Sequence, residues 1–295
     1  MEIPNHQVKK ICSICRRKSA RLKYNCQNER PVFTPGAFSP VAKDFGIFHD
    51  LYYCKECQHI FAQLSDSDIN LQYKEAEDPG NYFFLWQYRM GNLGRLFNKI
   101  YPFLECKTPK VFDVGAGGGI FLNLLKGLGI NGVGLEPSTQ LVRVGKERFG
   151  VNLIEGTLGE FQPKTSPFDL ITFLEVIEHM QCPREEIELA SRCLTQKGKV
   201  LLVTPNINSF SARCLGKRWW SFRQMHIQYF SGRSLDSLMK SLGFRLIWSG
   251  CFFKSFPISY YLSNLFPFKI TMPSFLDLNL RMSLGDMARL YARNE

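Results

Sequence analysis

The spacing of apolar residues alternates between strand-like runs and helix-like repeats in the second part of the chain. Five short apolar runs have the length of strands buried on both faces; they lie at 111–114, 132–135, 151–155, 168–174 and 199–204. Apolar residues recur every three or four positions in the segments between them, at 121–128, 138–149 and 185–194. Strands that alternate with helices predict an α/β fold with a doubly wound, Rossmann-like sheet.

The pattern continues on both sides of this region. Residues 81–104 are rich in aromatic side chains and have the pattern of a helix. A helix at 234–242 leads into a sixth strand at 244–253, and 287–292 is the seventh and last strand. Residues 254–280 are apolar and aromatic, but prolines interrupt them, so we expect no membrane span there. We expect this segment to cap a substrate cleft; dimer contact and peripheral membrane contact are the alternatives.

A glycine-rich turn follows the first strand and carries the strongest chemical signal. Asp113 lies near the end of the strand, Gly115, Gly117 and Gly119 follow the strand, and Glu136 stands at the carboxyl end of the next strand. Glycines let the backbone approach a ligand closely, and a helix N-terminus presents free N–H groups. A carboxylate at Glu136 can accept hydrogen bonds from both hydroxyls of a ribose. The pattern predicts a site for an adenosine-containing cofactor; NAD is the alternative, but its fingerprint needs glycine where Ile120 stands.

These motifs resemble those of the class I S-adenosylmethionine (SAM)-dependent methyltransferases. VFDVGAGGG is similar to their first motif, and VGLEPS to the acidic loop after their second strand. The resemblance implies that the last of the seven strands is antiparallel. It also implies a set of SAM-binding residues: Asp113, Gly115, Gly117, Gly119, Glu136, Thr157 and Leu158, with Tyr82 and Arg89 of a helical lid facing the cofactor carboxylate.

Two C-x-x-C pairs stand in the N-terminal part of the chain, at Cys12 and Cys15 and at Cys54 and Cys57. Four thiolates close a tetrahedral structural zinc site, whereas redox pairs and unligated thiols are the alternatives. The layout resembles a subset of class I methyltransferases with an N-terminal zinc ribbon. Zinc knuckles usually carry glycine after the second cysteine, but other residues stand there in this chain.

We therefore expect three parts in the chain. A zinc-ribbon module covers 1–64, and a linker with the helical lid covers 65–106. The methyltransferase domain covers 107–295, with substrate-side insertions at 205–230 and 254–284.

Two histidines are candidates for the chemistry of methyl transfer, because histidine can remove a proton from an acceptor near neutral pH. His179 lies in LEVIEHM, four residues after Glu175, so on a helix the two would share one face. The segment resembles the ExxEH motif of ubiquinone-pathway O-methyltransferases, where it implies a divalent metal or substrate positioning; bracing of the turn is the alternative. His226 lies in RWWSFRQMHIQYFS and is predicted to be the general base or to orient the acceptor, with a structural role in the loop as the alternative.

The segment around His226 is also basic and aromatic, which predicts an anionic small-molecule acceptor such as a nucleotide-linked sugar, a lipid precursor or a quinone-like phenol. The predicted substrate contacts are Arg213, Arg218, Trp219 and Arg223. Aromatic residues between basic ones also suit RNA, which makes an RNA-modifying methyltransferase an alternative. RNA is less favoured because no recognised RNA-binding module accompanies the segment. A cofactor fold that has lost catalysis and only binds a partner is the remaining alternative.

Charge and composition fit this interpretation. The 295 residues carry a net charge of +11, with basic side chains concentrated at the N-terminus and after the fifth predicted strand. The hydrophobic content of 45% supports a sizeable core. With no apolar leader and no membrane span expected, we predict a cytoplasmic protein, in which ten cysteines indicate metal binding or free thiols rather than disulfides.

Overall fold

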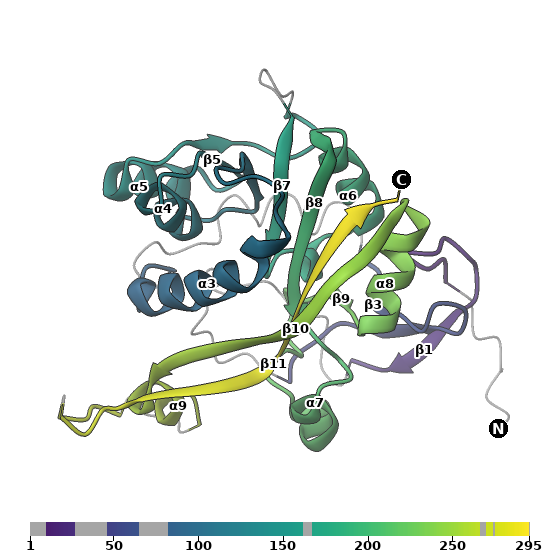
Figure 1. The fold of residues 1–295 in the computed structure, drawn as a ribbon. Coiled ribbons are helices and arrows are strands. Elements are labelled where there is room, and N and C mark those ends of the chain that lie inside the picture. The colour runs from purple at the N-terminus through teal and green to yellow at the C-terminus, as the bar shows by residue number, and fades with distance from the viewer. Residues whose placement is uncertain are drawn as a thin grey trace, which may run out of the picture.

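The computed structural model describes residues 10–26, 46–64, 82–161, 167–265, 270–273 and 275–294. A large sheet with helices on both faces forms the body, and a small second sheet lies beside it (Figure 1). The strands are β1 (Ala20–Tyr24), β2 (Leu51–Cys54), β3 (Ile60–Ala62), β4 (Val111–Val114), β5 (Gly132–Glu136), β6 (Leu153–Glu155), β7 (Phe168–Leu174), β8 (Leu194–Pro205), β9 (Gln228–Tyr229), β10 (Phe244–Pro257) and β11 (Asn279–Arg293). The helices are α3 (Trp86–Ile100), α4 (Ile120–Gly127), α5 (Thr139–Phe149), α6 (Pro183–Ser191), α7 (Phe210–Leu215), α8 (Gly232–Ser241) and α9 (Ile258–Leu265), with short turns η1 (Tyr101–Phe103), η2 (Ile177–His179) and η3 (Gly216–Arg218).

The large sheet has the strand order β10-β11-β8-β7-β4-β5-β6. Strands β6, β5, β4, β7 and β8 are parallel, whereas β11 is antiparallel to both of its neighbours. This confirms the predicted seven-stranded α/β sheet with an antiparallel last strand. The strand order changes direction between β4 and β7, and ligands of such sheets bind at the carboxyl ends of the strands near that point.

The central strands are buried on both faces, as their continuous apolar runs predict. In β8, Val200 and Leu202 pack into a cluster that contains side chains of α6 and α8. Leu201 and Val203 point to the opposite face and join a cluster with side chains of α3, α4 and α5. A fully buried aliphatic side chain contributes about 1.5–3 kcal/mol, so these two layers hold the sheet rigid beneath the site.

Local signals fix the helices around the cofactor turn. Helix α5 begins after Ser138, whose hydroxyl accepts a hydrogen bond from the Leu141 N–H at 3.3 Å, and ends at Gly150 in a left-handed conformation. The predicted helix before the first strand forms as α3. The linker part of the predicted 65–106 segment lies outside the described residues, which resume at Tyr82.

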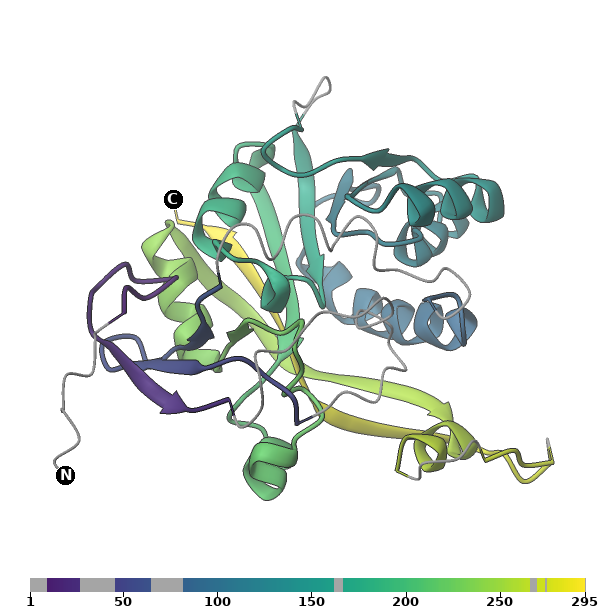
Figure 2. The ribbon, with the colours of Figure 1, turned by 180° about the vertical axis from the view of Figure 1, so that it is seen from behind.

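The last two strands are longer than predicted and form a projecting arm. Strands β10 and β11 pair from Phe244 with Arg293 to Pro257 with Asn279, but β8 covers β11 only from Asp286 to Ala292. The remainder is a two-stranded arm that carries α9 and extends away from the body (Figures 1 and 2). Within the described ranges, no helix has the length and apolar character needed to cross a membrane.

The small sheet combines two distant parts of the chain. Its order is β1-β2-β3-β9, so its fourth strand comes from the segment that follows His226 rather than from the N-terminal residues. The N-terminal module lies against α8 and this segment, as Figure 2 also shows.

Candidate active site and zinc site

A cavity of about 960 Å³ opens at the carboxyl ends of the parallel strands. Residues that follow β4, β5, β6 and β7 form its walls, together with the α3 helix, the His226 region and the base of the arm. It takes in nearly all of the predicted cofactor and catalytic residues: Tyr82, Arg89, Asp113, Gly115, Gly117, Glu136, Thr157, Leu158, Glu175, His179 and His226. Residues that were predicted separately as cofactor and catalytic groups therefore share one cavity.

The glycine turn is shaped for close contact. Gly117 has φ 53°, and a Cβ atom on it would lie 2.2 Å from the Tyr82 hydroxyl oxygen. Any side chain at this position would displace Tyr82. Gly119 lies outside the cavity lining; it is the N-cap of α4, and a Cβ there would meet Val151 at 2.8 Å. In this structure Gly119 therefore shapes the helix start rather than the cavity surface.

Two buried carboxyl groups hold this turn. The Glu136 carboxylate accepts hydrogen bonds from the Gly117 N–H at 2.8 Å and from the Ser138 N–H at 2.9 Å. Asp113 accepts one from the Thr172 hydroxyl at 2.6 Å. Burial raises the pKa of Glu136 despite its two N–H donors, and burial raises the pKa of Asp113 to about 7. Hydrogen bonds donated by a ligand would stabilise the charged form of both carboxyl groups.

The lid residues meet the glycine turn from the other side. The Arg89 guanidinium donates to the Tyr82 carbonyl at 2.8 Å and lies 4.5 Å from the centre of the Tyr82 ring. These contacts hold the Tyr82 ring against Gly117, where the resemblance places the methionine part of SAM.

The acceptor side of the cavity contains two adjacent histidines. The ring centres of His179 and His226 are 4.8 Å apart. His179 Nδ1 contacts the Met225 carbonyl at 2.9 Å, and His226 Nδ1 contacts the Ser221 carbonyl at 2.8 Å. A carbonyl only accepts, so each Nδ1 carries the hydrogen and each Nε2 keeps its lone pair. Burial lowers both pKa values, that of His179 to about 4, so both rings are neutral at pH 7.

Glu178 of the ExxEH motif completes this group, and the structure brings it together with His226 from outside the motif. The ligand atoms of Glu178, His179 and His226 lie within 4.8 Å of one another. The motif forms the short turn η2 rather than an α-helix, so the predicted shared helical face of Glu175 and His179 does not exist. Two imidazoles and a carboxylate are a donor set that suits a divalent cation.

Glu175 has a different partner that the sequence analysis missed. Its carboxylate forms an ion pair with Lys254, whose ammonium also lies 3.0 Å from the Asp286 carboxylate. All three line the cavity, and Lys254 is 17% exposed. A lone lysine and a lone aspartate within apolar strands are the only sequence signal of this network.

The predicted substrate residues are not brought together. Arg223 lines the cavity, whereas Arg213 and Arg218 are exposed and lie outside its lining. The predicted substrate contact of Trp219 is wrong. Its side chain is fully buried and packs edge-on against Phe222, so a substrate cannot reach it. Sequence proximity to Arg223 misled the prediction, because Arg218 is exposed whereas Trp219, the next residue, is fully buried.

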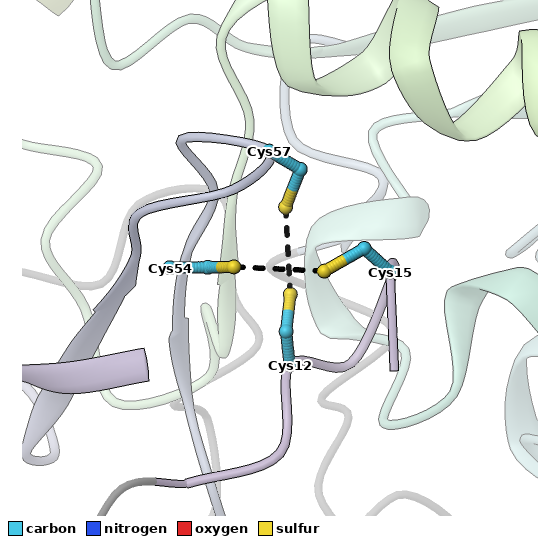
Figure 3. Close-up of side chains that lie close together, drawn as sticks. All are labelled: Cys12, Cys15, Cys54 and Cys57. Carbon is cyan, nitrogen blue, oxygen red and sulfur yellow. Dashed lines mark hydrogen bonds between the residues drawn. The ribbon is translucent and has the colours of Figure 1, made fainter. Parts of the chain in front are cut away.

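The four cysteines converge at one point in the N-terminal module (Figure 3). Cys12 Sγ lies 3.5 Å from Cys57 Sγ, and Cys15 Sγ lies 3.5 Å from Cys54 Sγ; all four lie within 4.8 Å of one another. Zinc–sulfur bonds of about 2.3 Å in a tetrahedron place the sulfurs about 3.8 Å apart, so the donor set fits zinc.

The residue after the second cysteine of each C-x-x-C pair adopts the left-handed backbone conformation that glycine usually adopts, although neither residue is glycine. Arg16 and Gln58 have φ values of 58° and 60°. Their N–H groups donate to the carbonyls of Cys12 and Cys54 at 3.0 and 2.9 Å. A non-glycine residue in this conformation costs about 1–2 kcal/mol, which the surrounding turn and the four-cysteine cluster must offset.

The buried carboxyl groups predict a pH-dependent stability. Burial raises the pKa of Glu178 to about 8 and that of Asp113 to about 7. Stability from such raised groups is complete below the unfolded pKa and is lost as pH rises through the folded pKa. We expect the free energy of unfolding of metal-free protein to fall from about pH 4.5 and to level off near pH 8, as measured by urea denaturation. Glu178→Gln should flatten this slope, whereas a Gln at exposed Glu155 should leave it unchanged; a wild-type slope in Glu178→Gln would contradict the assignment.

Comparison with known proteins places the chain in a family. The profile of a methyltransferase domain family matches residues 85–248, which is more than half of the chain. The chain belongs to this methyltransferase family. Its fold is that of the class I SAM-dependent methyltransferases, and the family implies SAM as its cofactor. Residue-level contacts with SAM stay predictions.

Solved structures agree on the fold of the methyltransferase. A SAM-dependent methyltransferase from Thermotoga maritima is similar with a TM-score of 0.50 and 18% identity, over 73% of this chain and 94% of that one. A magnesium protoporphyrin IX methyltransferase from Synechocystis is similar with a TM-score of 0.50 and 12% identity, over 75% and 91%. At these identities the likeness shows the fold alone.

Curated relatives include a ubiquinone biosynthesis O-methyltransferase from Erwinia tasmaniensis, which is 32% identical over 108 residues. That match covers 35% of this chain and 44% of the relative. A relative of the same name from Idiomarina loihiensis is 33% identical over 108 residues, covering 34% and 43%. This chain therefore spans less than half the length of these curated relatives.

Proposed function

We propose that this methyltransferase transfers the methyl group of SAM to a hydroxyl oxygen of a small molecule, with His226 as the base. The observation that carries the proposal is the pair of neutral histidines in the cavity that also contains the glycine turn and Glu136. Methyl transfer is an in-line displacement, so holding the acceptor close to the sulfonium supplies much of the acceleration. The acceptor oxygen forms a bond to the methyl carbon while the carbon–sulfur bond breaks. The hydroxyl proton passes to His226 Nε2, and S-adenosylhomocysteine (SAH) leaves.

The walls of the acceptor side support an aromatic or otherwise planar acceptor that carries an acidic hydroxyl. Trp220, Phe256 and Tyr260 line this part of the cavity, and Arg223 supplies a positive charge there. A guanidinium favours a phenolate or a carboxylate beside the reacting oxygen. The names of the curated relatives, ubiquinone biosynthesis O-methyltransferases, favour a phenol over a nucleotide-linked sugar. A divalent cation held by Glu178, His179 and His226 is the alternative to the imidazole base, since it would occupy His226 Nε2 and polarise the oxygen instead.

His226→Gln tests the proposal. We expect at least about a 100-fold loss of turnover with SAM and the carboxylated catechol protocatechuate, because a glutamine cannot take the proton. The affinity for SAH should change less than about two-fold, since His226 lies on the acceptor side. The measurement is the rate of SAH release, with SAH titration calorimetry beside it.

The control for this variant is His49→Gln, because His49 lies outside the cavity lining. Wild-type turnover in His226→Gln would exclude His226 as the base. A rate that rises on addition of Mg²⁺ or Mn²⁺ to protein prepared without them would favour the cation-assisted route over a free imidazole.

An RNA acceptor is the alternative that the exposed basic residues keep open. Arg213, Lys217 and Arg218 lie outside the cavity lining, and the Lys217 ammonium is 6.0 Å from the centre of the Tyr24 ring. Methylation of RNA but not of catechols, with retention that falls steeply with salt, would favour that alternative.

Peripheral membrane contact through residues 254–280 is a further part of the proposal. The arm exposes apolar side chains at Phe275, Leu276, Leu278 and Leu280, next to Arg281. Apolar side chains beside a cation suit the surface of an anionic bilayer. The base of the same arm lines the cavity, so the arm connects the proposed bilayer contact to the acceptor side.

We expect the wild type to co-sediment with phosphatidylglycerol vesicles and Phe275→Asp/Leu278→Asp to lose at least about ten-fold of this binding, because each aspartate adds charge to the apolar surface. Leu128→Asp is the control, since Leu128 is 52% exposed at the end of α4 in the body. Equal vesicle binding by the double variant and by Leu128→Asp would contradict membrane contact through the arm. Self-association of the wild type without vesicles would contradict it too and would favour contact between copies of the chain.

A further inference from the structure

The four-cysteine module contacts the methyltransferase domain at the part of the chain that carries His226. We call residues 225–229 the His226 segment and residues 177–181 the acceptor turn. Strand β9 in the His226 segment pairs with β3 of the module, and the Ala62 N–H donates to the Ile227 carbonyl at 2.7 Å. On its other side, the Ile227 N–H donates to the Glu178 carbonyl at 2.9 Å. The His226 segment is therefore held between the module and the acceptor turn.

One side chain joins all three parts. Gln228 is 2% exposed, and its amide group has partners at both ends. Its Oε1 accepts hydrogen bonds from the Ser13 hydroxyl at 2.8 Å and from His59 Nε2 at 2.8 Å. Its Nε2 donates to the carbonyls of Met180 and Gln181 at 3.0 and 3.3 Å. The amide thus links the module to the backbone directly after His179.

The chemistry of the partners fixes the direction of this link. Two backbone carbonyls can only accept, so the amide nitrogen of Gln228 faces the acceptor turn and its oxygen faces the module. His59 must then carry its hydrogen on Nε2. The His59 ring is fully buried, and this nitrogen is its donor to the Gln228 oxygen. A fully paired buried amide of this kind tolerates one orientation only.

Each C-x-x-C pair of the module has a nearby residue that donates a hydrogen bond to the same atom, Gln228 Oε1. Ser13 lies between Cys12 and Cys15, and His59 follows Cys57 by two residues and directly precedes β3. The two donors come from segments that are far apart in the chain, and the four-cysteine cluster brings those segments together. Without a closed cluster, Ser13 and His59 have no covalent or metal-mediated constraint that keeps them at one point.

A second set of contacts reaches the helix that follows the acceptor turn. Helix α6 begins directly after it, and Arg184 of α6 donates to the Ile14 carbonyl at 2.8 Å. Glu185 of the same helix forms an ion pair with Arg16 of the first knuckle. The module therefore holds the chain that follows Glu178 and His179 at two places, at Met180 and Gln181 through Gln228 and at the first turn of α6.

We propose that the four-cysteine module positions the acceptor side of the active site, and that Gln228 is the positioning residue through which it acts. This proposal rests on the proposed function of His179 and His226. It gives the module a role beyond local folding: the closed cluster sets the distance and orientation between the two histidines. Cofactor binding at Glu136 and the glycine turn lies outside this set of contacts.

The first test is hydrogen exchange of the zinc-loaded full chain in Gln228→Met, which keeps the side-chain length but removes four hydrogen bonds. We expect exchange in peptides covering 177–181 and 225–229 to rise at least about ten-fold, because Ile227 N–H protection depends on the linked segments. Peptides of α4 and the affinity for SAH should stay within about two-fold. Unchanged exchange in both segments, with Gln228→Met folded and zinc retained, would overturn the proposal.

Two further variants keep the test decisive if Gln228→Met folds poorly. Ser13→Ala removes one donor on the module side and should raise exchange in the same two segments by a smaller factor. Arg17→Gln is the matched control, since Arg17 pairs with Glu56 within the module and both side chains are exposed. Equal exchange in Ser13→Ala and Arg17→Gln would contradict a path through Gln228.

A spectroscopic measurement separates positioning from stability alone. Nitrogen NMR of the imidazoles should show His179 as the Nδ1–H tautomer in the wild type and a mixture of tautomers in Gln228→Met, because the Met225 carbonyl moves. A single unchanged tautomer would indicate a purely structural role. Neither exchange nor tautomer depends on the acceptor, so failure to methylate any catechol would contradict the proposed function and leave these results standing.

Discussion

Glu136→Ala should weaken the binding of SAH about 100-fold in calorimetric titration of the folded protein. Glu136 is predicted to accept hydrogen bonds from both ribose hydroxyls, and hydrogen bonds to a charged group contribute about 1.5–3 kcal/mol each. A loss of about 3 kcal/mol corresponds to roughly a 100-fold change in the dissociation constant. The variant also leaves the N–H groups of Gly117 and Ser138 without their buried acceptor, which disturbs the turn that surrounds the cofactor.

Glu155→Ala is a closely matched control. Glu155 pairs with Glu136 in register on the neighbouring strand β6, but it is exposed and lies outside the cavity lining. Its replacement should change the affinity for SAH less than about two-fold, since surface carboxylates contribute little. Similar losses in both variants would point to a general effect of charge, and wild-type affinity in Glu136→Ala would place the ribose elsewhere.

The cofactor half of the cavity could be predicted because its signals are local in the sequence. Asp113, the glycines and Glu136 stand within one strand–turn–helix–strand unit, and the register of parallel strands fixes their places relative to one another. The carboxyl ends of neighbouring strands meet at one edge whatever the rest of the chain does. A reader of the sequence can therefore place these groups together without knowing any long-range contact.

The acceptor half could not be predicted to the same degree, because its groups come from segments that only the tertiary fold brings together. Lys254 reaches Glu175 and Asp286 through the pairing of β10 with β11, and the sequence does not show which of the arm's faces points to the cavity. Arg218 and Arg223 carry the same charge on one short segment, yet only Arg223 lines the cavity. Likewise, the two residues of β9 are too few to give any strand signal.

Cys54→Ser should abolish stoichiometric zinc binding and lower the melting temperature by about 10 °C or more. Four thiolates hold structural zinc with apparent energies of roughly 10–16 kcal/mol in small zinc-dependent domains, and a hydroxyl is a poor ligand for this ion. A loss of a few kcal/mol shifts the midpoint of a chain of this size by about ten degrees. The expected result is about one zinc per chain in the wild type and less than about a tenth of that in the variant, by atomic emission.

Cys106→Ser controls for loss of a thiol, because Cys106 is exposed and outside the cluster. The variant pair also separates the alternatives for the four cysteines. Unligated thiols would make Cys54→Ser cost only about 1–2 kcal/mol, with no effect of a chelator on the wild-type midpoint. Redox pairs would make the wild-type midpoint sensitive to reductant instead. A zinc site predicts the opposite combination: the chelator lowers the wild-type midpoint to that of Cys54→Ser and leaves the variant unchanged, because only the wild type has a metal to lose.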